Sequence, residues 1–450
     1  MTDLHPILIR HGRVIDPANN LDAVADVLIV DGKIAAVSPK VSENDLKPYK
    51  QSLTGLEMFD ARGLYILPGL VDLRAHLGEP GNEGAETIAG GALAAVHGGF
   101  TTVACMPDTE PALDSEAAAL YVRRQSDQAG YADVYPVCAL TKKREGKELA
   151  ELGQLAEAGA VAFSDEQRAT DCPATLLRGM AYASMFDRAV IEYAQDPNLA
   201  GGAMNAGYEC TLAGLPGIPA VAEELAIARA CMFARDAGAH FHAANLTSRN
   251  AVRAVKRARK MGVRVTAETS PHYLCLTDAE VRKQYDTNYK VFPPLRTKED
   301  IGWLKRGLRE GVIDCIASGH QPVAPEAKEL EFGRAPFGII GLETALTLAL
   351  RALVETDELP LARVIAAMTI NPARVLRLQK NKGHLGVGAD GDICMFDPKY
   401  KWTVDPSLLV SRCKNTPFAG MELVGKPRYT IARGRMFDLA MMEPAPAAKS

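Results

Sequence analysis

Three side chains that can hold ions or move protons lie two residues apart in the apolar stretch 64–77, namely Asp72, Arg74 and His76. Spacing by two in an extended strand puts all three on one face. A carboxylate and an imidazole are metal ligands and also groups for acid–base catalysis. The guanidinium between them keeps its proton and repels a divalent cation. The stretch therefore points to hydrolytic chemistry. Such chemistry often uses a metal ion, and the guanidinium of Arg74 would repel that ion.

Polar residues also follow the other short apolar runs of the chain. In a closed parallel barrel the carboxyl ends of the strands meet at one rim, and that rim carries the chemistry. We therefore expect a polar rim to which the later runs contribute Asp108, 164–166, 193–196, 242–245, 270–272 and 318–320.

The elements that must position these residues alternate regularly. Eight β-leaning runs are separated by helical patterns, and they cover 64–77, 102–106, 134–140, 160–163, 189–193, 240–244, 264–268 and 314–317. This alternation predicts an α/β fold, a (β/α)₈ barrel of the TIM type. An open doubly wound sheet is the alternative, but no Gly-x-Gly-x-x-Gly follows the first run, which argues against dinucleotide binding. Hairpin-like stretches at both ends predict a small β domain built from the two termini.

A zinc site needs at least three good protein ligands and a water. At the expected rim only His76 and Asp165 are plausible ligands, because Tyr193 and the amide of Asn245 are poor substitutes for imidazole. The pair His240 and His242 has ligand spacing but lies upstream of the strand end. A lone base is a further possibility at His320. The sequence thus predicts no tight metal site and no cofactor.

Composition excludes several classes of function. The net charge is −4 with no basic excess, and no run reaches the ~18–20 apolar residues of a membrane span, so we expect neither nucleic-acid nor membrane partners. The first residues lack a secretory signal, and nine scattered cysteines without a Cys-x-x-Cys pair favour reduced thiols in the cytoplasm. The basic segment 253–260 reads as the solvated face of a barrel helix, with a partner-binding face as the alternative.

A set of collinear motifs resembles one family along nearly the whole chain. The motifs cover 68–81, 100–107, 212–220, 265–272, 293–296, 335–343, 371–374, 382–385 and 414–418. They are similar to those of the larger, bacterial-type dihydroorotases of the amidohydrolase superfamily. The resemblance implies a barrel over 66–379 and a β-sandwich domain formed by 1–65 plus 380–440. Residues 441–450 are expected to be a disordered tail.

The resemblance also implies which positions would form the family's site. Its zinc-binding His-x-His pair falls on Arg74 and His76, and its acidic ligand falls on Asp165. Four changed positions are implied for the remaining ligands and the carboxylate grip: Tyr193, Asn245, Gly319 and Gly78. Three further substrate-side positions are implied to be degenerate: Asp108, Phe292 and Val323.

These replacements lead to a functional expectation. Zinc brings the pKa of bound water from about 15.7 to about 7, so a lost metal removes roughly 12 kcal/mol of help in forming hydroxide. We therefore expect a pseudoenzyme, a non-catalytic dihydroorotase-like chain of de novo pyrimidine biosynthesis. Its implied role is a structural or assembly subunit that binds the aspartate carbamoyltransferase catalytic chain and other copies of itself.

Two alternatives stay open. The chain could be an active zinc-dependent dihydroorotase, or another cyclic amidohydrolase, that uses an atypical metal site at His76 and Asp165. It could also be a free-standing protein that binds a small molecule in the degenerate cleft.

Overall fold

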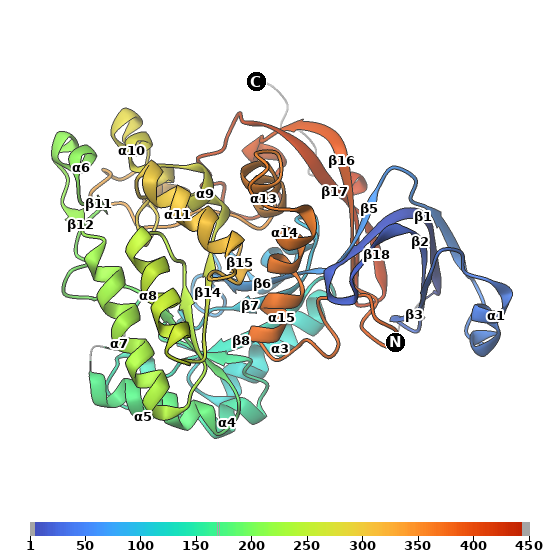
Figure 1. Ribbon diagram of the computed structural model, residues 1–450, viewed down its shortest axis with the longest axis horizontal. Coiled ribbons are helices and arrows are strands. Elements are labelled where there is room, and N and C mark those ends of the chain that lie inside the picture. The colour runs from blue at the N-terminus through green and yellow to red at the C-terminus, as the bar shows by residue number, and fades with distance from the viewer. Residues whose placement is uncertain (1–4, 169, 171, 443–450) are drawn as a thin grey trace.

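The computed structural model describes residues 5–168, 170 and 172–442. A parallel barrel and a β-sheet domain lie side by side, and the sheet domain combines strands from both ends of the chain (Figure 1). The tail predicted for 441–450 lies, from residue 443 on, outside the described residues. Within the described part, no helix is both long and apolar enough to cross a membrane.

Eight parallel strands of the described chain form the barrel sheet, in the order β15-β14-β13-β10-β9-β8-β7-β6. Their bounds are Leu70–Ala75 for β6, Phe100–Cys105 for β7, Asp133–Cys138 for β8, Ala162–Phe163 for β9, Ala189–Tyr193 for β10, Phe241–Ala244 for β13, Val265–Thr269 for β14 and Cys315–Ile316 for β15. A parallel bridge joins Ala75 to His320, so the end of β6 meets the loop after β15. This contact nearly closes the ring and confirms the predicted fold class.

Helices cover the outside of the barrel strands (Figure 1). The longer ones are α2 (Ile88–His97), α3 (Glu116–Ala129), α5 (Pro173–Ser184), α7 (Val221–Ala237), α8 (Arg249–Lys260), α11 (Lys298–Arg309), α13 (Ala345–Leu353) and α14 (Leu361–Met368). Shorter helices also occur in the segments between and after the strands, namely α4 (Leu152–Glu157), α6 (Tyr208–Ala213), α9 (Pro271–Cys275), α10 (Asp278–Gln284), α12 (Pro325–Lys328) and α15 (Ile370–Val375).

Helix α8 shows why such segments become helical here. Ser248 caps its first turn by accepting the N–H of Ala251. Its buried residues recur at helical spacing and are Ala251, Val252, Val255 and Ala258, which places its basic residues on the other face. Two of these residues form ion pairs with acids on neighbouring segments, Lys256 with Glu310 and Arg259 with Asp314.

The terminal domain is one hydrogen-bonded sheet of eight strands, in the order β18-β17-β16-β5-β1-β2-β3 with β4 also paired to β1. Its strands are β1 (Ile7–Asp16), β2 (Leu21–Val30), β3 (Lys33–Ser38), β4 (Glu57–Asp60), β5 (Tyr65–Pro68), β16 (Ile393–Thr403), β17 (Glu422–Ala432) and β18 (Arg435–Asp438). A short helix, α1 (Glu43–Leu46), follows β3. The first and last parts of the chain therefore meet at the β5–β16 pair.

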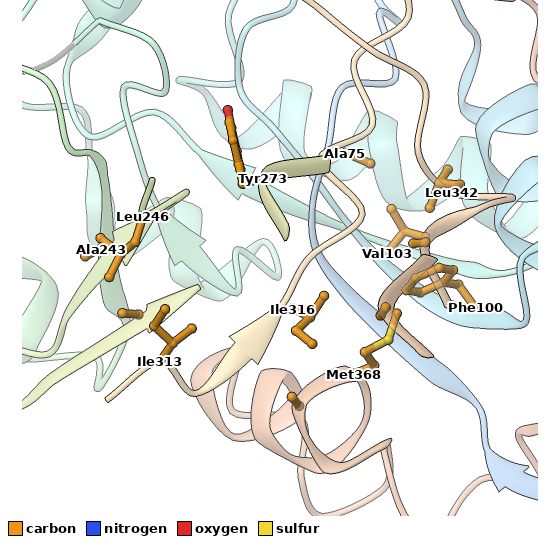
Figure 2. Packing of buried hydrophobic residues seen from close by; sticks show 14 of the residues in the cluster. Ala75, Phe100, Val103, Ala243, Leu246, Tyr273, Ile313, Ile316, Leu342 and Met368 are labelled. Carbon is orange, nitrogen blue, oxygen red and sulfur yellow. The ribbon is translucent and has the colours of Figure 1, made fainter. Parts of the chain in front are cut away.

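The barrel core lies between the strands and the surrounding helices. Figure 2 shows Phe100 and Val103 of β7 near Met368 of α14, with Ile316 of β15 close by. All four are fully buried in one apolar cluster. This packing holds the strand ends in fixed positions and so determines where the rim side chains stand.

Candidate active site

The first barrel strand carries the central side chains of the rim. Asp72 and Arg74 lie in β6 and His76 follows it, with exposures of 0%, 3% and 6%. The carboxylate of Asp72 accepts the backbone N–H of Ser318 at 2.7 Å and the Ser318 hydroxyl at 2.5 Å. Burial raises the pKa of Asp72 to about 7. These two hydrogen bonds tie β6 to the loop after β15.

The guanidinium of Arg74 lies between two buried carboxylates. Its Nη1 donates to Glu166 Oε1 at 2.9 Å, and its Nε donates to Glu268 Oε1 at 3.1 Å. Its Cζ lies 4.9 Å from the ring centroid of Tyr193. Burial alone would lower the pKa of Arg74, but Tyr193 and the two carboxylates raise it well above its usual value. Arg74 is therefore a permanent buried cation.

His76 forms a close pair with Asp108. Its Nδ1 lies 2.6 Å from Asp108 Oδ2, and its Nε2 lies 3.3 Å from Glu166 Oε1. Burial would lower the pKa of His76, but Asp108 and Glu166 outweigh burial and raise it to about 9. Burial would likewise raise the pKa of Asp108, but His76 lowers it to about 2. At neutral pH the pair is an imidazolium and a carboxylate, so Asp108, a degenerate position by prediction, is the direct partner of His76.

Of the two neighbouring acids Asp165 and Glu166, it is Glu166 that lies beside His76. Asp165 turns away: its carboxylate accepts the N–H and the hydroxyl of Thr141 at 2.9 and 2.6 Å. Glu166 has a positive φ of 53°, so the backbone leaves the strand conformation between the two acids. Strand alternation cannot choose between neighbouring acids at such a turn, and a ligand role for Asp165 stays a prediction.

Two predicted replacement positions are engaged in other contacts. Tyr193 is buried and stacks on Phe292, with ring centroids 5.2 Å apart and planes 4° apart. Asn245 accepts the hydroxyl of Ser270 at 2.8 Å. Phe292, a position predicted to face the substrate, also contacts Phe337 at 5.1 Å between ring centroids. Positions 193 and 292 are thus used for aromatic packing, and position 245 forms a neutral hydrogen bond.

The glycines at two rim positions leave no room for a side chain. Gly319 has a φ of +65°, and a Cβ there would lie 2.7 Å from His272 Cε1 and 2.8 Å from Ser270 Oγ. Gly78 has a φ of +67°, and a Cβ there would lie 2.6 and 2.8 Å from two backbone carbonyl oxygens. The surrounding chain has closed over both positions.

Other predicted candidates lie apart from this centre or have structural partners. Val323 is buried, and its N–H donates to Asn415 Oδ1 at 3.1 Å. His240 Nε2 lies 2.8 Å from the hydroxyl of Thr266. His320 Nδ1 accepts the N–H of Gly341 at 3.2 Å, and burial lowers its pKa to about 3. His320 is therefore neutral at neutral pH, and its low pKa makes it a weak base.

Sequence reasoning gave no role to Glu166 and Glu268 and placed His242 upstream of the site. In the structure His242 Nε2 lies 3.3 Å from Glu268 Oε2, so it supports the carboxylate that holds Arg74. Glu268 stands in the motif 265–272, and this position was the available signal. A buried cation such as Arg74 also requires acidic partners, so its presence in the first strand predicts acids at neighbouring strand ends.

The residues present do not fit the zinc ion that the resemblance implies. Among the rim residues that the structure describes, the His76 imidazole is already paired with Asp108, and Glu166 and Glu268 each accept a hydrogen bond from Arg74. At an effective dielectric constant of 20, unit charges 4 Å apart repel by about 4 kcal/mol, so a divalent ion beside Arg74 meets about twice that. Elsewhere, the carboxylates of Asp133, Asp390 and Asp392 cluster within ligand distance, but Lys382 Nζ bonds all three.

The comparisons with known proteins cover nearly the whole chain. A family model described as dihydro-orotase-like matches residues 63–251, and one described as amidohydrolase family matches 337–437. A protein named dihydroorotase from Syntrophus aciditrophicus (strain SB) is 46% identical over 96% of this chain and 98% of its own. The chain belongs to the dihydroorotase family. A second relative of that name, from Syntrophotalea carbinolica, is 44% identical over 96% of this chain and 98% of its own.

Solved structures agree on the fold of this dihydroorotase-family chain. An L-hydantoinase from Arthrobacter aurescens has a TM-score of 0.82 at 26% identity, covering 96% of this chain and 95% of its own. A dihydropyrimidinase from Brevibacillus agri has a TM-score of 0.80 at 24% identity, covering 96% and 94%, and shows the fold alone.

These comparisons overturn the expectation of a pseudoenzyme that serves as an assembly subunit. Relatives at 42–46% identity over most of the chain are named dihydroorotase, and the similar structures are hydrolytic enzymes. The expectation equated changed zinc ligands with loss of all chemistry. The rim, however, retains a charged, buried set of proton donors and acceptors, so that inference does not follow.

Proposed function

We propose that this chain is a cyclic amidohydrolase, which opens an amide ring with water or closes it in the reverse direction. The observation that carries the proposal is the 46% identity to a protein named dihydroorotase over 96% of the chain. The likeness to an L-hydantoinase, also named for a cyclic substrate, supports the same reaction class.

The rim supplies the two proton transfers that ring opening requires. Burial would raise the pKa of Glu166, but Arg74 and His76 lower it, so Glu166 is an ionised carboxylate at neutral pH. Its Oε2 is buried and has no hydrogen-bond partner among the described residues, so this oxygen can accept a proton from water. His76, with its pKa raised to about 9, holds a proton at neutral pH that it can give to the departing amide nitrogen. The water oxygen bonds to the carbonyl carbon, the ring C–N bond breaks, and the two protons balance. Asp108 orients His76 throughout.

The charges favour a ring that carries no carboxylate. Three carboxylates, those of Asp108, Glu166 and Glu268, surround two cations, Arg74 and His76. A negatively charged ring would be repelled by this net negative rim, whereas a neutral ring would not be repelled. The charges therefore favour neutral rings such as dihydrouracil and hydantoin, whereas the name of the relatives favours dihydroorotate.

A substrate panel tests the proposal. The purified chain is assayed with dihydroorotate, dihydrouracil and hydantoin between pH 6 and 9, and ring opening is followed by chromatography. We expect turnover of at least one ring, reduced ~10²–10⁴-fold in the Glu166→Gln and His76→Asn variants. No turnover above the rate without protein, for any of the three, would exclude this function.

Association with an aspartate carbamoyltransferase catalytic chain and self-association stay predictions, which co-elution of purified chains tests. A cytoplasmic location also stays a prediction, supported by nine cysteines that are all free.

A further inference from the structure

The guanidinium of Arg74 stands where the strand ends converge, and its contacts are those of a bound cation. We propose that Arg74 is a built-in cation that replaces a divalent metal ion in this barrel and keeps zinc out of the rim. The inference concerns what the site binds and is independent of whether the site turns over a substrate.

The first support is the use of the carboxylates. Glu166 and Glu268 come from different strand ends, and each gives one oxygen to Arg74, at 2.9 and 3.1 Å. The Glu166 oxygen that bonds Arg74 also lies 3.3 Å from His76 Nε2. One carboxylate thus bridges two cationic groups, the arrangement that a bridging ligand makes between two metal ions. The bridging position is therefore already filled by side chains.

The second support is the lack of space for further ligands around Arg74. A side chain at position 319 would run into His272 and Ser270, and its backbone has a left-handed φ. Ser270 in turn donates its hydroxyl to Asn245. The Tyr193 ring covers another side of the guanidinium. Further ligands could not enter without moving these groups, so the site is built around Arg74.

The third support is that the chain itself supplies an acidic partner for each cation of the centre. Glu268 is also held by His242 at 3.3 Å, and His76 is paired with Asp108 at 2.6 Å. Every cation in the centre has a buried or half-buried acid beside it. A divalent ion would add two positive charges to this set and would have to displace Arg74 from both carboxylates.

Cobalt titration tests the proposal, because cobalt(II) bound by histidine and carboxylates absorbs visible light. The full chain, purified without chelator, is analysed for metal content and titrated with cobalt chloride and zinc chloride. We expect less than about 0.1 metal per chain, no visible cobalt band and no change in melting temperature, consistent with fewer than three free ligands. Arg74→Lys, which keeps the charge, is the matched control and should behave in the same way.

Arg74→His removes the cation and offers an imidazole beside His76 and Glu166. We expect this variant to gain a cobalt band and a zinc-dependent rise in melting temperature. Stoichiometric metal in the wild-type chain would overturn the proposal, and so would a folded Arg74→His variant that binds no more metal than wild type. If Arg74→His does not fold, the wild-type and Arg74→Lys titrations still decide. Ring turnover by a zinc-loaded wild-type chain would overturn this inference and leave the proposed function standing.

Discussion

At the level of single residues, the central side chains of the rim each form ion pairs or hydrogen bonds with more than one neighbour. Arg74 serves two carboxylates, and Glu166 serves both Arg74 and His76. The unusual residue at position 74 could be recognised from the sequence, since a guanidinium where a ligand is expected is evident from residue type alone. Its acidic partners could not, because they come from strands far away along the chain.

Replacing Arg74 by Met is expected to lower the free energy of unfolding by about 3–5 kcal/mol, because two buried carboxylates lose their cation. Urea unfolding monitored by circular dichroism measures this loss. Arg124→Met, at an exposed position of α3, is the control and should stay within about 0.5 kcal/mol of wild type. A loss below about 1 kcal/mol in Arg74→Met would show that the ion pairs are not formed in solution.

The His76–Asp108 pair predicts a pH-dependent stability. The pKa of His76 is raised from 6.5 to about 9, so its contribution is complete below pH 6.5 and is lost as pH rises to 9. The pKa of Asp108 is lowered from 3.8 to about 2, so its contribution is complete above pH 3.8 and is lost toward pH 2. The stability gap between wild type and Asp108→Asn should therefore shrink by about 2 kcal/mol from pH 6 to 9.

Urea unfolding at pH 6, 7.5 and 9 checks this trend. Asp236→Asn, at an exposed position of α7, supplies the control and should show a gap that does not change with pH. A gap for Asp108→Asn that stays constant or widens toward pH 9 would mean that His76 is not held protonated by Asp108.

At the level of elements, the barrel is closed by contacts between its first strand and the loop after its last. Ser318 binds Asp72 through two hydrogen bonds, and Gly319 turns the backbone with a φ of +65°. The next residue, His320, forms the bridge to Ala75. The loop that follows β15 thus has little freedom to accept larger side chains.

Gly319→Ala is expected to destabilise the chain by about 2–4 kcal/mol, since it combines a left-handed φ with contacts shorter than 3 Å. Gly333→Ala is the matched control, because an added Cβ there meets nothing within 4 Å. Thermal unfolding of both variants measures the difference. Equal melting temperatures for the two variants would show that the loop adapts to a side chain at 319.

The sequence predicted element types well and element limits less well. The apolar stretch 64–77 was expected to be one strand, but it forms β5 of the terminal sheet and β6 of the barrel. Gly69 separates the two, and a Cβ there would lie 2.1 Å from Thr101 Oγ1. Hydrophobic alternation continues through this change of sheet, so the pattern alone carries no signal for it. The approach of Glu166 to His76 could not be predicted for a similar reason, because alternation does not reveal the backbone turn at Glu166.

At the level of the whole molecule, Lys382 connects the barrel to the terminal sheet. Its Nζ lies 2.6 Å from Asp133 at the start of β8 and 2.7 Å from Asp392 just before β16. Arg433 Nε also lies 2.8 Å from Asp133. Lys382 is buried, and the surrounding carboxylates raise its pKa well above the usual value against the effect of burial. This cluster is a structural joint between the two parts.

Lys382→Met is expected to cost about 3–5 kcal/mol, because it leaves several acids around an uncharged side chain. Lys380→Met, two residues away and exposed, is the control and should be nearly neutral. Differential scanning calorimetry distinguishes the variants and shows whether the two parts still unfold together. An unchanged single transition in Lys382→Met would contradict a role for this joint.

The pairing of β5 with β16 has a consequence for synthesis on the ribosome. β5 ends at Pro68, whereas its neighbour β16 begins at Ile393. At ~5–20 residues per second, the nascent chain waits on the order of tens of seconds before that neighbour emerges. During this interval β5 presents unpaired backbone groups on which another nascent chain could add a strand. Completion of the terminal sheet therefore marks a chain whose barrel has been fully translated.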